Sequence, residues 1–170
     1  MTPLPSILLA TPAPLAAWRL DQNRHAATWS SGEGARLMGG RWNSKGRKVV
    51  YCALDPATAI LEVAVHKGFK ALDTVPHTLT SIVVDVPALV HVVQPGAVPN
   101  PNWLRPGYVS AGQQQFGDQL LATYPFLVVP SVVSHYSWNL IFDADTAAGH
   151  YTLLAQLPFE LDGRLHPPPA

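Results

Sequence analysis

The chain has 170 residues, of which 48% are hydrophobic and only 13% are charged. This length fits one domain with a substantial core, and the composition is too apolar for a disordered protein. The formal net charge is zero, so no overall field draws the chain to nucleic acid or to an anionic membrane. We therefore predict that it binds neither directly. A local group of basic residues within residues 36–48 forms either a small basic pocket or a solvated loop: Arg36, Arg41, Lys45, Arg47 and Lys48.

Cys52 is the only cysteine, which excludes an intrachain disulfide and a cysteine-based zinc site. It lies in an apolar run, so we predict a buried small hydrophobic residue and not a nucleophile. The apolar N-terminal stretch lacks a basic start and is interrupted by prolines, which is not typical of a signal peptide. No run of the sequence is long and apolar enough to span a membrane. These features favour a location in the reducing cytoplasm.

The first predicted elements follow an irregular arm, rich in proline and alanine, over residues 1–17. A strand opens near Trp18, and the β-rich run Val49–Leu54 predicts a second strand after a glycine turn. A helix is expected over Pro56–Lys67, because Asp55 is a good N-cap, proline suits the first helical position and a glycine follows the last turn.

The second half of the chain continues with strands and one further helix, which is expected over residues 110–125 and ends at a proline. Alternating and β-rich runs predict strands over residues 78–88, 89–93, 126–133, 138–143 and 150–161. Strands and helices follow one another without regular βαβ alternation. We therefore predict an α+β fold in one compact domain over residues 18–162, with central antiparallel or mixed β-sheets, flanking helices and a flexible tail over residues 163–170.

Glu62 is the residue that fits its surroundings least. It lies in the predicted helix between Leu61 and Val63, in a stretch that otherwise reads as core. An isolated buried carboxylate would cost several kcal/mol. Glu62 therefore either forms a salt bridge with a neighbouring arginine or lines a cleft with a chemical role, and the residues alone favour neither.

The glycine-rich stretch Gly32–Gly46 is a candidate anion cradle, because glycine lets backbone N–H groups approach a phosphate and arginine binds phosphate with a bidentate fork. It carries Arg36 and Arg41. It matches neither a P-loop, which requires a Lys-Ser/Thr pair, nor a dinucleotide-binding G-x-G-x-x-G turn. On spacing alone, a surface loop without a role is the better interpretation.

The remaining candidates have ordinary structural interpretations as well. Tyr51 either stacks on a flat ligand or is a core tyrosine, and Ser131 alone indicates only a turn. Trp138 and Asn139 fit a core residue and a cap. The histidines lack metal-ligand spacing, so we predict no metal. There is no G-x-S-x-G sequence for a serine hydrolase.

Taken together, these pieces resemble the RES-domain family of bacterial toxins, which is named for an Arg, a Glu and a Ser. These fall on Arg41 in "GGRWNSKG", Glu62 in "ALDPATAILEVAVH" and Ser131 in "VVPSVV". The stretch "GARLMGGRWNSKGRKVVYCALDPATAILEVAVH" follows the family pattern almost throughout, and Arg19 in "WRL" matches an upstream arginine. The resemblance covers roughly residues 17 to 145. The chain departs from the pattern after Ser131, where "SVVSHYSWNL" lacks the usual acidic residue but keeps Asn139.

The resemblance implies an ADP-ribosyltransferase-like fold and an enzyme that takes NAD as its substrate. It would cleave the nicotinamide–ribose bond by hydrolysis or phosphorolysis, deplete cellular NAD and arrest growth. Glu62 would stabilise the cationic transition state. The resemblance implies substrate contacts for the other site residues: Arg41 and Arg19 on the pyrophosphate, Gly39 and Gly40 in close backbone approach, Tyr51 stacked on the nicotinamide or the ribose face, and Ser131 with Asn139 on the nicotinamide amide or its ribose.

Two other functions stay open at this stage. One is an ADP-ribosyltransferase that modifies a cellular protein, because water, phosphate and a side chain all attack the same ribose carbon. The other is a catalytically inactive RES-fold binding module, for which the altered stretch after Ser131 is the main support. The resemblance also implies a partner, a helix-turn-helix (Xre-type) antitoxin that blocks the active site, and a homodimer.

Overall fold

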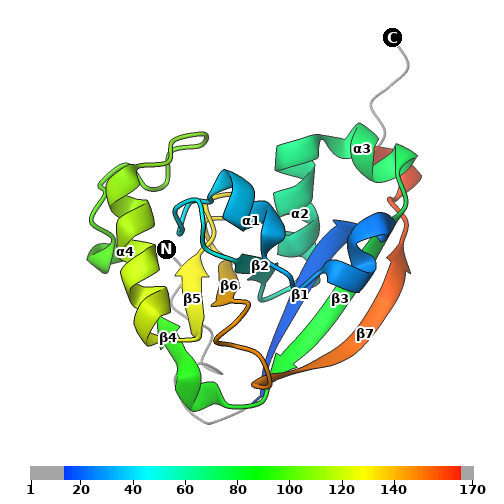
Figure 1. Ribbon diagram of the computed structural model, residues 1–170. Coiled ribbons are helices and arrows are strands. Elements are labelled where there is room, and N and C mark those ends of the chain that lie inside the picture. Colours follow the sequence, from blue (N-terminus) through cyan, green and yellow to red (C-terminus); the bar gives the residue numbers. More distant parts are fainter. Residues whose placement is uncertain (1–13, 166–170) are drawn as a thin grey trace.

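The computed structural model describes residues 14–165 and contains one mixed seven-stranded sheet with four α-helices around it (Figure 1). The strand order is β4-β5-β6-β2-β1-β3-β7, in which β4 and β5 are parallel and the other neighbours are antiparallel. The strands are β1 (Leu15–Gln22), β2 (Val49–Ala53), β3 (His77–Val84), β4 (Val90–Val92), β5 (Phe126–Pro130), β6 (Trp138–Asp143) and β7 (Tyr151–Phe159). The predicted α+β class with a mixed sheet is confirmed.

The helices cover the sheet in two places. Helix α4 (Ala111–Thr123) packs beside β5, in one half of the sheet. Helix α2 (Pro56–Lys67) packs beside β1, in the other half (Figure 1). Two short helices complete the set, α1 (Glu33–Met38) and α3 (Phe69–Thr74). Short 3₁₀ turns lie at residues 23–28, 87–89, 95–97 and 163–165. No helix within residues 14–165 combines the length and the apolar character that crossing a bilayer requires.

The sheet has a joint with little strand pairing in its middle, between β1 and β2. Strand β1 pairs with β3 along its whole length, from Leu15 to Gln22, but it pairs with β2 only where Trp18 lies opposite Ala53. The two halves, β4-β5-β6-β2 and β1-β3-β7, therefore diverge on either side of that pair. Buried side chains fill the spaces around both halves, with Phe126 and Phe142 wholly buried in the largest cluster.

The ends of the domain differ from the prediction. Strand β1 already begins at Leu15, inside the arm expected to be irregular over residues 1–17, because Leu15 pairs with Val84 of β3. Residues 1–13 lie outside the described part of the chain. At the other end, Gly163–Leu165 forms a 3₁₀ turn within the expected flexible tail, and residues 166–170 lie outside the described part.

The glycine-rich stretch is more ordered than expected. It contains helix α1, whose C-cap Gly39 has a positive φ of 72° and donates its N–H to the Ala35 carbonyl at 2.8 Å.

Helix α2 matches its predicted range residue for residue. Its cap is the expected one, because Asp55 Oδ1 accepts the Thr58 N–H at 2.7 Å.

Candidate functional site

The strand register brings Glu62, Ser131 and Asn139 to one end of the sheet. Ser131 directly follows β5, and Asn139 is the second residue of β6 and lies opposite Val129 of β5. Asn139 also pairs with Ala53, the last residue of β2. Helix α2 starts three residues after Ala53 and carries Glu62 in its second turn. Residues distant in the sequence therefore meet because three strand ends coincide.

The carboxylate of Glu62 is held at one oxygen by two side-chain donors. Ser131 Oγ donates to Glu62 Oε1 at 3.0 Å, and Asn139 Nδ2 donates to the same oxygen at 2.8 Å. The second oxygen, Oε2, accepts no hydrogen bond from residues 14–165 and lies 4.0 Å from His66 Nε2. The Glu62 side chain is 26% exposed. Glu62 is thus an oriented carboxylate with one oxygen available to a ligand, and no arginine of the described residues pairs with it.

The turn between β5 and β6 fixes the hydroxyl of Ser131. Ser131 is buried, and its Oγ accepts the Ser134 N–H at 3.0 Å while it donates to Glu62. The Ser131 N–H donates to the Ser137 carbonyl at 3.0 Å, and the hydroxyls of Ser134 and Ser137 are 2.8 Å apart. The stretch that departs from the family pattern therefore still places both donors on Glu62. Ser131 and Asn139, expected to contact the nicotinamide amide or its ribose, orient the carboxylate here.

Arg41 binds a loop that is distant from it in the sequence. Its Nη1 donates to the carbonyls of Trp103 at 2.8 Å and Tyr108 at 2.7 Å, and its Nη2 donates to the Arg105 carbonyl at 3.4 Å. Partial burial lowers the pKa of Arg41, and the nearby negative charge of Glu62 opposes that shift. Arg41 thus lies within electrostatic reach of Glu62 and is satisfied by neutral carbonyl oxygens.

The residues on both sides of Arg41 are held firmly. The Gly40 N–H donates to the Asn43 carbonyl at 2.9 Å, and the Gly40 carbonyl accepts Gln114 Nε2 at 2.8 Å. The Trp42 N–H donates to the Tyr51 hydroxyl at 3.2 Å. Both N–H groups expected to face a phosphate, those of Gly39 and Gly40, are therefore used inside the loop.

Tyr51 belongs to this framework. Its hydroxyl donates to Asn43 Oδ1 at 2.7 Å, and burial of the phenol raises the pKa of Tyr51. A Cβ added to Gly40 would lie 2.8 Å from the Tyr51 Cζ, so glycine is required for this close approach. The hydroxyl end of the Tyr51 ring is enclosed, which favours the interpretation of Tyr51 as a core residue over its interpretation as a stacking surface.

Arg19 lies on β1, at the joint between β1 and β2. It forms a two-point ion pair with Asp21, with bonds of 2.7 and 2.8 Å, and its Nη1 donates to the Tyr51 carbonyl at 2.8 Å. Because β1 and β2 diverge beyond Trp18, the Tyr51 carbonyl accepts a side chain there. Arg19 therefore links the two halves of the sheet, and in this structure its donors face protein groups.

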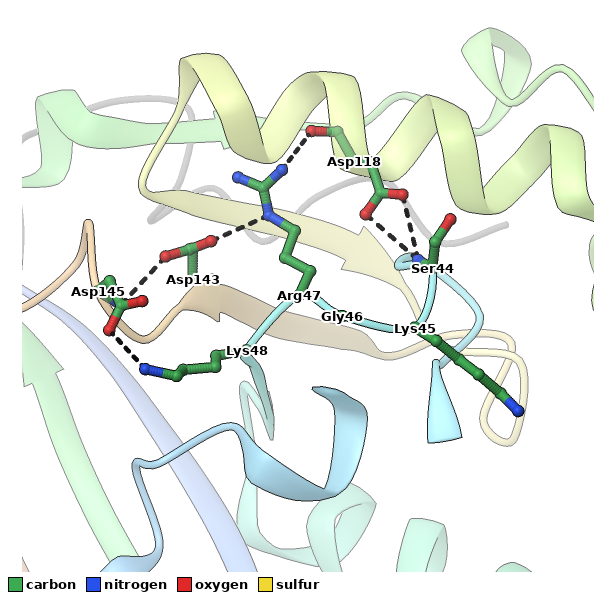
Figure 2. Close-up of a pocket in the computed structure, with 8 residues that line it drawn as sticks. All are labelled: Ser44, Lys45, Gly46, Arg47, Lys48, Asp118, Asp143 and Asp145. Atoms are coloured by element: carbon green, nitrogen blue, oxygen red, sulfur yellow. Dashed lines mark hydrogen bonds and ion pairs between the residues drawn. The ribbon is translucent and has the colours of Figure 1, made fainter. Parts of the chain in front are cut away.

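The basic group found in the sequence is mostly neutralised within the protein. Arg47 pairs with Asp143 at 2.9 Å and Lys48 with Asp145 at 3.3 Å, and these residues line an open cavity of about 460 Å³. Figure 2 shows how these side chains point toward one another. Val49 lies opposite Asp143 and Ala53 lies opposite Asn139, so this cavity is at the other end of β2 and β6 from Glu62. The cluster is a set of ion pairs that closes a loop, and Arg36 pairs with Glu33 in the same manner.

Cys52 is buried, as predicted, and burial raises the pKa of its thiol from 9.0 to about 12. A thiol with that pKa has almost no nucleophilic thiolate at neutral pH. Within residues 14–165, no group of three or more His, Cys, Asp or Glu side chains is arranged to hold a metal ion.

Sequence reasoning missed the residues that build the loop around Arg41. Asn43 is fully buried, and its Nδ2 donates to the carbonyls of Ala35 at 3.2 Å and Ser44 at 2.9 Å. Asp118 of α4 accepts the Ser44 N–H at 3.2 Å. An asparagine in a Trp-Asn-Ser-Lys-Gly turn was the available signal, since asparagine side chains commonly bond nearby backbone. No local sequence pattern indicated which carbonyl groups Arg41 binds.

Comparisons with known proteins show the family of the chain. The RES domain family matches residues 16–162. The chain belongs to the RES-domain family. A RES relative from Photorhabdus laumondii subsp. laumondii, named "Toxin Res", is 31% identical over 152 residues, which cover 87% of this chain and 95% of that protein. Another from Pseudomonas putida with the same name is 31% identical and covers 79% of this chain and 91% of the relative.

Two further comparisons extend the picture. A relative from a Sphingobium species, named "Prs ADP-ribosylating toxin", is 33% identical over 74% of this chain and 80% of its own length. A chain in the crystal structure of the M. tuberculosis MbcT–MbcA toxin–antitoxin complex superposes with a TM-score of 0.70 at 20% identity, covering 88% of this chain and 86% of that chain. The latter match shows a shared fold.

Proposed function

We propose that this RES-domain chain is the toxin of a toxin–antitoxin pair and that it cleaves NAD between nicotinamide and ribose. The observation that carries the proposal is the carboxylate of Glu62, which is fixed through Oε1 by two donors while Oε2 keeps its capacity to accept. The relatives named as toxins, which match most of the chain, support the toxin assignment.

The chemistry requires a carboxylate of this kind. The nicotinamide–ribose bond breaks through an oxocarbenium-like transition state, in which positive charge develops on the ribose. The bonding electron pair moves to the pyridinium nitrogen, so nicotinamide leaves as a neutral molecule and needs no strong general acid. Glu62 stabilises the developing cation, and its Oε2 is free to accept a ribose hydroxyl. Water or phosphate then adds to the ribose carbon and releases a proton.

Arg41 supplies the positive charge that a dinucleotide needs. Its partners in this structure are neutral carbonyls, and no carboxylate of residues 14–165 forms an ion pair with it. A partly buried cation without an ion-pair partner favours an anionic ligand. The pyrophosphate of NAD meets that need, and the electrostatic coupling of Arg41 to Glu62 is consistent with one substrate spanning both.

A second candidate function is transfer of ADP-ribose to a cellular protein. The Sphingobium relative is named as an ADP-ribosylating toxin, and the first half of the reaction is the same at Glu62. The two functions differ only in which nucleophile reaches the ribose carbon.

The partner we propose is an antitoxin that covers the site. Exposed apolar side chains come from the elements that carry the site: Leu61 and Val65 lie on the same helix as Glu62, and Tyr136 lies in the turn between Ser131 and Asn139. Apolar side chains exposed close together are typical of a protein-binding surface. The solved relative in a toxin–antitoxin complex supports this assignment. The helix-turn-helix type of the antitoxin, a homodimer and a cytoplasmic location stay predictions.

The test is to incubate the purified chain with NAD, with and without phosphate, and to identify the products by chromatography. Nicotinamide with free ADP-ribose indicates hydrolysis, and a phosphorylated ADP-ribose indicates phosphorolysis. Nicotinamide release only in the presence of lysate, with ADP-ribose found on a protein by mass spectrometry, establishes the transferase. A folded chain free of antitoxin that does none of these would refute both enzymatic functions and leave the inactive binding module.

A further inference from the structure

The substrate needs a surface for its flat rings, and Tyr51 is a partly buried member of the framework around Arg41. The Tyr51 hydroxyl is bound between Asn43 and the Trp42 N–H, and Gly40 packs against the end of its ring. Aromatic rings contribute to base recognition when a face is open to the ligand. A more exposed ring comes from another element.

The loop of residues 101–109 presents such a ring next to Arg41. Trp103 is buried and anchors the loop in the core beside α4, whereas Tyr108 is 49% exposed. The Tyr108 carbonyl accepts a 2.7 Å bond from Arg41 Nη1, so the position of this residue is fixed by the same guanidinium that we assign to the pyrophosphate. The phenol of Tyr108 makes no hydrogen bond to any of residues 14–165.

Arg41 links the two other groups of the site, as the pyrophosphate links the two nucleosides of the dinucleotide. Glu62 and Arg41 are electrostatic neighbours, and Tyr108 contacts Arg41 through its backbone. In NAD the scissile bond, the pyrophosphate and the adenosine follow one another in the same sequence. With the scissile bond at Glu62 and the pyrophosphate at Arg41, the adenosine extends toward the 101–109 loop.

We infer that Tyr108 is a substrate-binding residue whose ring stacks on the adenine of NAD. This assignment rests on the proposed NAD-cleaving function and adds to it a basis for preferring a dinucleotide over a mononucleotide. Stacking of a base on an aromatic side chain contributes about 1–3 kcal/mol. Since adenine lies away from the bond that breaks, the contact is the same in the ground state and the transition state, and it acts on KM and not on kcat.

The test compares two substrates that share the scissile bond. NAD carries adenosine, and nicotinamide mononucleotide lacks it. We expect Tyr108→Ala to raise KM for NAD by about 5- to 100-fold with kcat unchanged, and to leave cleavage of the mononucleotide as in the wild type. Tyr108→Phe keeps the ring and should retain the wild-type KM. Val109→Ala is the matched control, because Val109 is the next exposed residue of the same loop and carries no ring.

The outcomes separate this inference from the function on which it rests. Equal losses on both substrates in Tyr108→Ala would show that Tyr108 only supports Arg41 and would overturn the stacking assignment. Wild-type kinetics on NAD would overturn it as well. Binding of ADP-ribose, measured by calorimetry, gives a readout without turnover, and we expect it to weaken by a similar factor in Tyr108→Ala. A wild-type chain that cleaves neither substrate and binds no ADP-ribose would refute the proposed function itself.

Discussion

Gly117 lets helix α4 pack directly on the loop that carries Arg41. A Cβ built at Gly117 would lie 2.7 Å from the carbonyl carbon of Trp42 and 3.0 Å from its Cα. Non-bonded carbon atoms prefer about 3.5–4.0 Å, so Gly117→Ala forces the helix and the Trp42 backbone apart by nearly 1 Å. Because Trp42 directly follows Arg41, the displacement reaches the functional site.

Two opposing effects set the magnitude of this change. Alanine is favoured over glycine within a helix by about 1 kcal/mol, while over-packing a core contact costs about 1–3 kcal/mol or more. The overlap here is with backbone, which has no alternative rotamer, so the cost falls at the upper end. We expect Gly117→Ala to lower the free energy of unfolding by about 1–2 kcal/mol. A displacement of this size also reduces turnover, by up to about 100-fold.

The assay is urea unfolding of Gly117→Ala and Gly112→Ala beside the wild type, followed by nicotinamide release. Gly112 lies in the same helix and has nothing within 4 Å of its added Cβ, so its alanine variant should match the wild type or be more stable by up to about 1 kcal/mol. A Gly117→Ala variant as stable as Gly112→Ala would refute the close packing of α4 on Trp42.

Other consequences of the structure can be tested in the same way. Asn43→Ala removes the buried amide that holds the loop and the acceptor of the Tyr51 hydroxyl, so the free energy of unfolding should fall by about 2–4 kcal/mol; an unchanged thermal midpoint would contradict this role. Cys52, with its pKa raised to about 12, should resist iodoacetamide at pH 8 in the folded chain and react once the chain is unfolded in urea; fast labelling of native protein would show that the thiol is accessible. Burial of the same thiol makes stability fall as pH rises from about 9 toward 12, because the unfolded thiol ionises first. Cys52→Ala should show a smaller fall over that range, and an equal fall would assign it to other groups.

Local signals in the sequence predicted local structure well. Asp55 and Pro56 mark the start of α2 and Gly68 marks its end, and these signals act within a few residues of the helix they delimit. Helix α1 was missed because it spans only Glu33–Met38 inside a glycine-rich stretch, and a helix so short depends on tertiary contacts.

The site depended on contacts that no local pattern contains. Glu62 was identified from its unusual setting, and the family resemblance added Ser131 and Asn139. Their convergence on one carboxylate oxygen follows from the register of β2, β5 and β6, which a single sequence does not specify. Arg41 was identified as well, but its carbonyl partners lie 62 to 67 residues away in an irregular loop. Long-range contacts of this kind are fixed by the assembled fold.

The most direct test of the central claim is nicotinamide release by Glu62→Gln. Glutamine keeps the length of the side chain and an Oε1 that can accept from Ser131 and Asn139, so the fold and both hydrogen bonds should survive while the charge is lost. Glu62→Asp is the complementary variant, because it keeps the charge but withdraws the carboxylate by about 1.5 Å, the length of one carbon–carbon bond.

If Glu62 stabilises the oxocarbenium-like transition state, Glu62→Gln loses about 2–4 kcal/mol of that stabilisation, which is roughly 30- to 1000-fold in rate. Its thermal midpoint should stay close to that of the wild type, so that the loss is assigned to chemistry. A folded Glu62→Gln chain that releases nicotinamide from NAD at the wild-type rate would contradict the account.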